Sequence, residues 1–255
     1  MSKFFKKIYL FWGGLWFFMI YVCLFPFFVI IVQREQWHKY GFVLNKLWAM
    51  GFFTSVLMPF GREVRGSINK KKAYVYCPNH ASMLDIPTIG MSAKQFIVFV
   101  GKNSLSKIPI FGYMFNRLHI PINRNSLRDS YKAFERAKAA ILKGRSVLLY
   151  PEGGIRTKNP PNMVPFKDGA FRVAIETKTP IIPVTIVNNW KILFSYDFFL
   201  TWRPVKVIYH EPIPTDQLTL DDVDELKQQV YDIIYTELAT HFPTKMIKAS
   251  SVSNS

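Results

Sequence analysis

The segment NHASMLD places a histidine and an aspartate, His80 and Asp85, with four residues between them in an otherwise apolar run. The junction between a strand and the helix after it is a common place for binding and catalytic residues in α/β domains. An unperturbed imidazole titrates near about 6.5, so it can take and return a proton at neutral pH. If Asp85 orients the ring, His80 can act as a general base on a hydroxyl that the substrate brings.

The spacing restricts where these two side chains can meet. Residues five positions apart on one continuous helix point about 140° apart and do not touch. His80 is therefore expected before the helix, and Asp85 in its first turn, facing back. Two structural roles stay open here: a hydrogen-bonded core histidine, and a capping aspartate with Pro87 in the first turn, where its missing N–H does no harm. Ser82 as the cap is disfavoured, because Pro87 would then interrupt the helix.

The elements that must position this pair alternate between β-rich runs and amphipathic helical stretches from about Gly61 onward. This alternation predicts an α/β fold with a mostly parallel central sheet flanked by helices. Pro121 would need an edge position in such a sheet. The expected strands are 73–77, 95–100, 119–124, 146–150, 181–187 and 205–210, and the expected helices are 126–143, 167–177 and 221–240.

The N-terminus is apolar enough to enter a membrane. Ile8 to Val32 contains no charged residue, and a helix of this length exceeds the roughly 30 Å hydrocarbon core of a bilayer. A cleaved signal peptide fits poorly, since the run is too long and lacks a small-residue cleavage site. A second, weaker apolar stretch covers 40–60 and could be a membrane helix, an interfacial helix or part of the core. We expect a two-helix hairpin at the cytoplasmic (inner) membrane, with the remaining domain facing the cytoplasm.

Three parts of the chain follow from these patterns: a membrane-anchoring segment at 1–60, an α/β domain at 61–244 and a disordered tail at 245–255. The aromatic segment 189–204 fits neither the helix nor the strand period. It is interpreted either as a core loop or as an extra membrane contact.

The charge and cysteine content of the chain limit the classes of partner that we expect. Lysine and arginine total 33 against 17 acidic residues, a formal charge of +16 that suits anionic partners. The basic residues are scattered and form no recognisable nucleic-acid module, so a basic nucleic-acid-binding protein remains only a remote alternative and no nucleic-acid partner is expected. With Cys23 and Cys77 as the only cysteines, neither a disulfide framework nor a metal site is expected.

Four sequence blocks resemble the glycerolipid acyltransferase family in order and spacing. NHASMLD resembles the NH-x4-D signature of that family, and GKNSLSKIPIFGYMFNRLHIPINR (101–124) is similar to its second block. LLYPEGGIR (148–156) is similar to the third, usually FPEGTR, and TPIIPVTI (179–186) to the fourth. The resemblance covers roughly 74–187, and the family also carries a hydrophobic N-terminus.

The resemblance implies transfer of a fatty acyl group from acyl-CoA or acyl carrier protein to the sn-2 hydroxyl of lysophosphatidic acid, giving phosphatidic acid. No cofactor is implied beyond the acyl donor, and membrane lipids are the implied surroundings. His80 would be the general base and Asp85 its orienting acid. The implied substrate-binding residues are Lys102, Arg124, Glu152, Gly153 and Arg156, and the motif-supporting residues are Asn79, Pro109, Gly112 and Pro151. Glu152 could alternatively pin its own loop through backbone N–H groups.

Three departures from the family pattern affect the expected headgroup contacts. Ser104 stands where the family commonly has an acid, His119 lies near a missing glycine, and an extra residue moves Arg156 one place further from Glu152. An acceptor other than lysophosphatidic acid, such as a lyso-aminolipid or glycerol-3-phosphate, is therefore the alternative.

Overall fold

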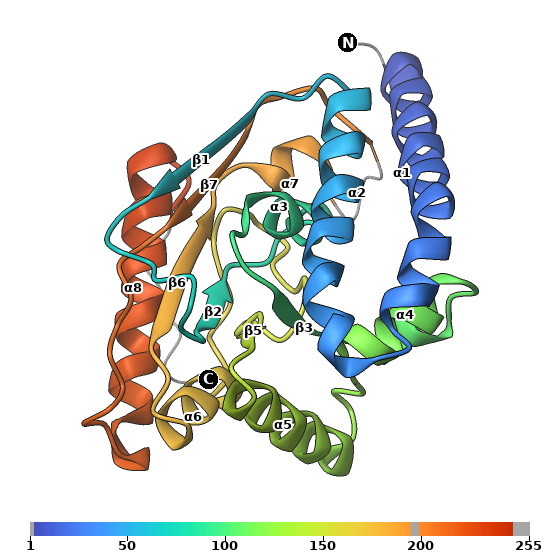
Figure 1. The fold of residues 1–255 in the computed structure, drawn as a ribbon. Helices are drawn as coiled ribbons and strands as arrows, with labels where there is room; N and C mark the ends of the chain where they lie inside the picture. The colour runs from blue at the N-terminus through green and yellow to red at the C-terminus, as the bar shows by residue number, and fades with distance from the viewer. Residues whose placement is uncertain (1–2, 195–198, 247–255) are drawn as a thin grey trace.

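The computed structural model describes residues 3–194 and 199–246. At its centre is a seven-stranded sheet with the strand order β1-β7-β6-β2-β5-β3-β4 (Figure 1). The strands are β1 (Phe60–Val64), β2 (Val75–Pro78), β3 (Ile97–Lys102), β4 (Ile120–Ile122), β5 (Ser146–Leu148), β6 (Ile181–Ile186) and β7 (Val205–Tyr209). Within the described residues every neighbouring pair is parallel except β6 and β7. The mostly parallel sheet predicted from the sequence is thereby confirmed.

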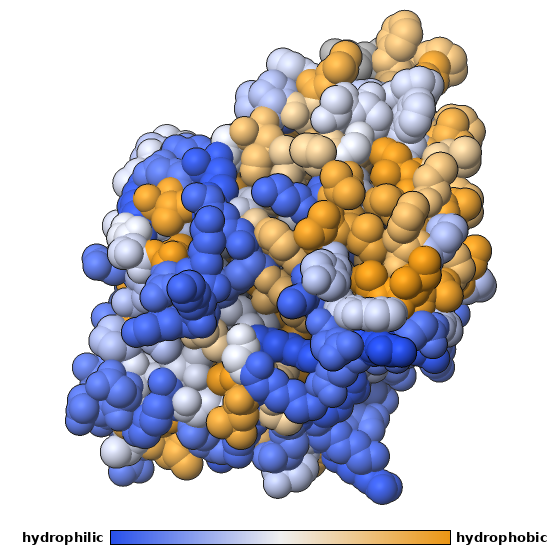
Figure 2. Space-filling view, in the orientation of Figure 1, coloured by the Kyte–Doolittle hydropathy of each residue, from blue (hydrophilic) through white to orange (hydrophobic). Residues whose placement is uncertain are grey.

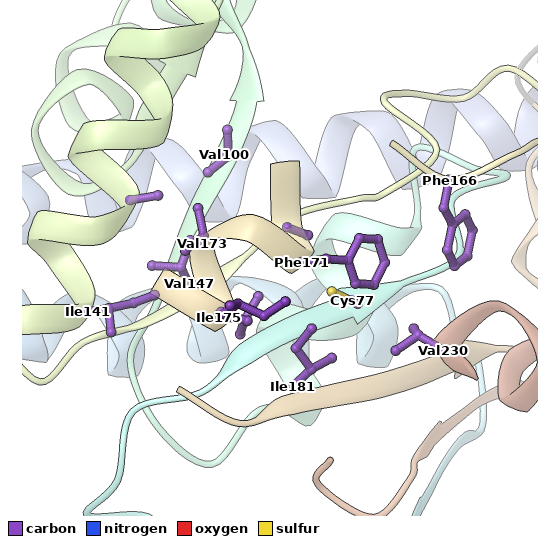
Figure 3. Close-up of a cluster of buried hydrophobic side chains, with 14 of the residues drawn as sticks. Cys77, Val100, Ile141, Val147, Phe166, Phe171, Val173, Ile175, Ile181 and Val230 are labelled. Atoms are coloured by element: carbon purple, nitrogen blue, oxygen red, sulfur yellow. The ribbon is translucent and has the colours of Figure 1, made fainter. Parts of the chain in front are cut away.

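Side chains of the inner strands alternate between the two faces of the sheet. Val75 and Cys77 join one buried cluster, whereas Tyr74 and Tyr76 join another on the opposite face. The first cluster lies under α5 (Leu127–Leu142), α6 (Gly169–Glu176) and α8 (Val223–His241). In Figure 3, Phe171 of α6 lies close to Cys77 of β2 within this cluster. Alternate side chains of the inner strands therefore pack against opposite helical layers. Both faces of the sheet are buried, as is usual for a parallel sheet.

The opposite face is covered by α3 (Asp85–Ser92) and by α2 (Gly41–Ser55), which packs against α3. Phe52 and Phe53 of α2 are buried beside Leu84 and Ile192. At about 1.5 Å per residue, α2 is roughly 22 Å long, which is shorter than a bilayer core. The second apolar stretch is therefore a helix of the folded body on its buried side.

The N-terminal helices form the expected hairpin. Helix α1 (Lys3–Ile31) runs alongside α2, and the 3-10 helix η1 (Glu35–Tyr40) joins them (Figure 1). The Tyr9 hydroxyl donates to the Val56 carbonyl, and the Trp48 indole N–H donates to the Phe17 carbonyl at 2.7 Å. Helix α1 is continuous through Pro26. It is thus docked on the domain at several points along its length.

The outward side of α1 is apolar. Among the described residues, α1 is the one helix long and apolar enough to cross a membrane by length and composition. Figure 2 shows hydrophobic residues gathered over α1 and α2, while the surface over α8 and α5 is largely hydrophilic. Exposed side chains of α1 include Phe4, Phe11, Trp12, Phe18 and Phe27. Such a large apolar area marks an interaction surface, and α1 is a candidate membrane anchor.

Sequence patterns predicted most elements of the α/β domain, but β1, α4 (Phe111–Leu118) and the short helix α7 (Asn189–Ile192) were missed. The strand predictions correspond to β2 to β7, the helix predictions to α5, α6 and α8, and Pro121 does lie on an edge strand, β4. Strand β1 was missed because Gly61, Arg62 and Glu63 interrupt any apolar run, as an edge strand allows. Helix α4 was missed because its pattern lies in the middle of the second motif block.

The predictions for the aromatic segment 189–204 and for the C-terminal tail are compared with the structure separately. Residues 189–192 form the short helix α7 (Asn189–Ile192), and Leu193 pairs with Leu200 in an antiparallel bridge. Ile192, Leu193 and Leu200 are buried beside α1 and α2, so the described part of the segment belongs to the core. The tail predicted for 245–255 begins too early: the Lys245 carbonyl accepts a hydrogen bond from Asn162, and Met246 packs against the core. Residues 195–198 and 247–255 lie outside the described residues.

Position 112 in α4 requires a glycine, because the backbone at Ser106 approaches it closely. A Cβ at this position would lie 2.1 Å from the Ser106 carbonyl oxygen, which is backbone and cannot turn away. The Gly112 N–H donates to the Ile108 carbonyl at 2.7 Å, and Pro109 lies in the same turn before α4. Both motif-supporting residues therefore shape the loop between β3 and α4.

Gly112→Ala is expected to destabilise the protein by about 1–3 kcal/mol, because the added methyl overlaps backbone atoms. Thermal unfolding of the detergent-solubilised protein, followed by circular dichroism, measures the effect. Gly169→Ala is the matched control, since a Cβ there meets no atom within 4 Å. Equal unfolding midpoints for the two variants would contradict the assigned contact.

Candidate active site

His80 and Asp85 meet at the carboxyl end of β2. The strand ends at Pro78, α3 begins at Asp85, and the residues between them form a tight loop. His80 Nδ1 lies 2.9 Å from Asp85 Oδ2. His80 is 7% exposed and Asp85 1% exposed. The loop therefore brings together two side chains that a continuous helix would have separated.

The carboxylate of Asp85 is held from several directions. Its Oδ2 also accepts the backbone N–H groups of Ala81 and Ser82, each at 2.9 Å. Its Oδ1 accepts Asn189 Nδ2 at 2.9 Å. Asp85 therefore closes the turn before α3 and orients the imidazole. The helix-capping role considered from the sequence was wrong, because the N-cap residue of α3 is Leu84, which makes no side-chain cap bond, and Asp85 bonds N–H groups that precede the helix. A carboxylate with this many donors stays fixed while the ring changes protonation state.

The imidazole ring of His80 is also held by an aromatic ring stacked on its face. The His80 ring stacks on the Tyr150 ring, with centroids 3.7 Å apart and planes 17° apart. Its Nε2 makes no hydrogen bond to any described residue, and it is not among the fully buried unpaired atoms. The nitrogen opposite Asp85 is therefore the one open to a substrate hydroxyl.

Glu152 anchors the loop after β5 to the histidine loop. Its Oε1 accepts the backbone N–H of His80 at 2.7 Å, and its Oε2 accepts that of Val164 at 3.2 Å. The residue is 1% exposed, and burial raises its pKa to about 8, although the two N–H donors oppose this shift. Each oxygen thus accepts one backbone N–H group. The bond to Val164 lies within the loop of Glu152 itself, as the sequence alternative had it, whereas the bond to His80 joins two separate loops.

Two further motif residues join strands at the same edge of the sheet. Asn79 Nδ2 donates to the Ile186 carbonyl at 3.1 Å, and its Oδ1 accepts the Ile186 N–H at 2.7 Å. The amide therefore continues the pairing between β2 and β6 past their ends. The carbonyl of Pro151 accepts the N–H of Lys167 at 2.9 Å and holds the loop against the start of α6.

The glycines after Glu152 allow a cation to approach the loop. Gly153 has φ +75° and Gly154 φ +143°, which is backbone that favours glycine. Arg124 donates through Nη1 to the Gly153 carbonyl. A Cβ at Gly154 would lie 2.6 Å from the same Nη1, so a side chain there would displace the guanidinium.

The cations expected to hold phosphate lie at this edge with different exposure. Arg124 is half-buried, and burial together with the positive charge of Arg156 lowers its pKa. Arg156 is exposed. Lys102 is exposed at the end of β3, paired in register with Ile122 two residues before Arg124.

Two residues at the site were missed by the sequence reading. Asn189 Nδ2 bonds Asp85 Oδ1 and also Thr88 Oγ1 at 2.8 Å. Tyr150 supplies the ring under His80. Tyr150 ends the predicted strand 146–150 and Asn189 follows the predicted strand 181–187, so their positions at the carboxyl ends of parallel strands were the available signal. Among the described residues no group of three or more histidine, cysteine or acidic side chains could hold a metal ion.

Glu152 makes stability depend on pH. Its folded pKa of about 8 lies above its ordinary 4.5, so the protonated form favours folding. This contribution is complete below about 4.5 and is lost as the pH rises through about 8. In Glu152→Gln that loss disappears, and the stability of the wild type relative to the variant should fall between pH 5 and 8. Denaturant unfolding across this range measures the difference.

The amide also costs one of the two hydrogen bonds at every pH, so only the pH-dependent part tests the assignment. The exposed substitution Glu225→Gln serves as the control and should not change with pH relative to wild type. A pH-independent difference for Glu152→Gln would contradict the buried, protonatable carboxyl.

Known proteins share the fold and these motifs. The family model described as Acyltransferase matches residues 61–187. A chloroplastic 1-acyl-sn-glycerol-3-phosphate acyltransferase of Brassica napus is 31% identical over 191 residues, covering 73% of this chain and 54% of that protein. The chloroplastic enzyme of that name from Arabidopsis thaliana is 32% identical over 186 residues, covering 71% and 49%. The chain thus spans about half the length of these curated relatives.

A solved structure extends the likeness to the N-terminal helices. The crystal structure of the 1-acyl-sn-glycerophosphate (LPA) acyltransferase PlsC from Thermotoga maritima matches with a TM-score of 0.74 at 23% identity, covering 95% of this chain and 100% of that chain. At this identity the match shows a shared fold. Together with the family model and the curated relatives, it establishes that this chain belongs to the acyltransferase family through residues 61–187.

Proposed function

We propose that this protein transfers a fatty acyl group from a thioester to the sn-2 hydroxyl of lysophosphatidic acid, giving phosphatidic acid. The observation that carries the proposal is the 2.9 Å contact of His80 Nδ1 with a fixed Asp85 carboxylate, which leaves Nε2 open. Relatives whose names state this activity support the choice of reaction.

The reaction needs one base and no covalent enzyme intermediate. His80 Nε2 takes the hydroxyl proton while the hydroxyl oxygen attacks the thioester carbonyl carbon. The tetrahedral intermediate collapses, the C–S bond breaks, and the leaving thiolate takes the proton back from the imidazolium. Asp85 stabilises the transient imidazolium and keeps Nδ1 as the donor toward it. Atoms balance, and the histidine returns to its neutral form.

The phosphate of the acceptor is assigned to the cations beside the glycine turn. Arg124 uses Nη1 to hold the Gly153 carbonyl, and its remaining nitrogens make no hydrogen bond to described residues. A planar guanidinium can bind two phosphate oxygens at once. Arg156 and Lys102 add positive charge at the same edge of the sheet. The mutual repulsion of Arg124 and Arg156 would be relieved by a bound anion.

The helix pair α1–α2 is assigned the role of membrane attachment. Helix α1 is docked on the domain at several points along its length, and its outward side carries exposed aromatic and aliphatic residues. A helix held in this way suits an arrangement that lies in one leaflet beside the domain. Lipid acceptors would then reach His80 from the bilayer, with the domain in the cytoplasm at the inner membrane.

His80→Ala should lower turnover by about 10²–10⁴-fold, because the general base is lost. Asp85→Asn should lower kcat with a smaller effect on acceptor KM, since ring orientation fails rather than binding. The measurement is thiol release from acyl-CoA or acyl carrier protein with detergent-solubilised protein, with products identified by mass spectrometry. Acceptors should include lysophosphatidic acid, glycerol-3-phosphate and a lyso-aminolipid.

His241→Ala, at the C-terminal end of α8, is the matched histidine control and should keep wild-type turnover, because this ring does not contact His80 or Asp85. Thiol release by wild type that is no faster than by His80→Ala, for every acceptor and donor, would sink the proposal. Faster acylation of the lyso-aminolipid or glycerol-3-phosphate would keep the chemistry and replace the acceptor.

Arg124→Ala should raise the KM for lysophosphatidic acid about tenfold or more, because a charge-assisted phosphate contact is lost. Turnover of an uncharged monoacylglycerol acceptor should change little. Arg128→Ala, at an exposed position in the first turn of α5, removes the same charge four residues further along the chain. Equal effects of the two variants would show that the phosphate is bound elsewhere.

A further inference from the structure

A cavity lies between the first turns of α1, the loop after Arg156, α7 and the residues that follow α8. Its volume is about 540 Å³, within the size range of small-molecule sites. Four lysines line it together with an indole: Lys6, Lys158, Lys191, Lys245 and Trp190. No acidic side chain is among the described residues that line it. The cavity is therefore strongly positive.

The four lysines have no acidic partner among the residues that the structure describes. Within the described part of the chain, none of them lies within 4.0 Å of a carboxylate, whereas Lys138, Lys143 and Lys227 elsewhere are all paired. Burial lowers the pKa of Lys191, and so do the positive charges of Lys245 and Arg203. A cluster of like charges in a hollow focuses a field that attracts an anion.

Aromatic rings hold these ammonium groups in place. Lys191 Nζ lies 4.1 Å from the Phe242 ring centroid and 5.1 Å from that of Trp190, and Lys245 Nζ lies 5.1 Å from the Trp190 ring. Asn162 fixes the Lys245 backbone by donating to its carbonyl at 2.9 Å. Ring faces orient a cation without cancelling its charge, so the field remains available to a ligand.

Two lining residues are close in the chain to residues of the candidate active site. Trp190 follows Asn189, whose amide bonds Asp85 Oδ1. Lys158 follows Arg156 by two residues. The segments that line the cavity are therefore the same segments that carry Asn189 and Arg156. The cavity is separate from Arg124, to which the acceptor phosphate has been assigned.

We propose that this cavity binds the phosphorylated nucleotide end of an acyl-CoA thioester. The inference rests on the proposed function, since it names the donor for that reaction. The 3′-phosphate and 5′-diphosphate of this donor match a group of several lysines that have no carboxylate partner among the described residues.

Other occupants fit these observations less well. A single lipid phosphate would leave most of the four cations unpaired. A carrier protein would contact a broad surface rather than fill a hollow of this volume. The Trp190 Nε1 donor is buried and has no acceptor among the described residues, which is uncommon without a bound partner.

Binding of adenosine 3′,5′-bisphosphate to the full-length protein in detergent, measured by isothermal titration calorimetry, tests the site without any catalysis. The variant Lys158→Glu with Lys245→Glu should weaken this binding by at least about tenfold. The double variant Lys71→Glu with Lys132→Glu makes the same charge change at exposed positions away from the cavity. It should bind the bisphosphate as wild type does.

Kinetics provide the second arm. The cavity variant should raise the KM for acyl-CoA at least about tenfold and leave turnover of an acyl-pantetheine, which lacks the nucleotide, unchanged. No bisphosphate binding by wild type, or equal weakening in both double variants, would overturn the assignment. So would loss of anionic-vesicle binding in the cavity variant with nucleotide binding intact. Nucleotide binding without acyl transfer from any donor would keep the cavity site and overturn the proposed function.

Discussion

The carboxylate of Asp85 is the constraint on which the site depends. One buried side chain accepts the imidazole, two backbone N–H groups of the preceding loop and the amide of Asn189. The loop is thereby closed around a single acceptor, and the histidine ring is fixed relative to α3 and α7 together. Because an unpaired buried carboxylate is costly, the donors must all be present for this geometry to persist.

A second buried carboxylate ties this loop to the next one. Glu152 holds the backbone of His80 from one side while Tyr150, two residues earlier, stacks on its ring. The histidine is therefore held at its backbone N–H, at its ring face and at Nδ1. Nε2 is the ring nitrogen that has no partner among the described residues. Restraint of this kind favours catalysis because no reorganisation is needed when the proton moves.

The distribution of apolar and charged groups separates the two sides of the molecule. The exposed side of α1 is aromatic and aliphatic, whereas the carboxyl edge of the sheet carries Arg124, Arg156 and Lys102, with further lysines around α7. Docking of α1 against α2 and the domain places the apolar surface and the cationic edge on one rigid body. The acyl transfer proposed above requires that the apolar surface and the cationic edge lie within reach of one base.

The sequence by itself determined the mostly parallel sheet, the long apolar helix and the pairing of His80 with Asp85, because side-chain period, apolar length and loop spacing are local properties. It also indicated the glycine turn beside Arg124. Only the tertiary structure decided that Glu152 pins the histidine loop, that Asn189 holds Asp85, and that α1 lies along the domain. Those contacts join residues up to about a hundred positions apart. Such contacts depend on how strands and helices pack in space, and no local pattern records that packing.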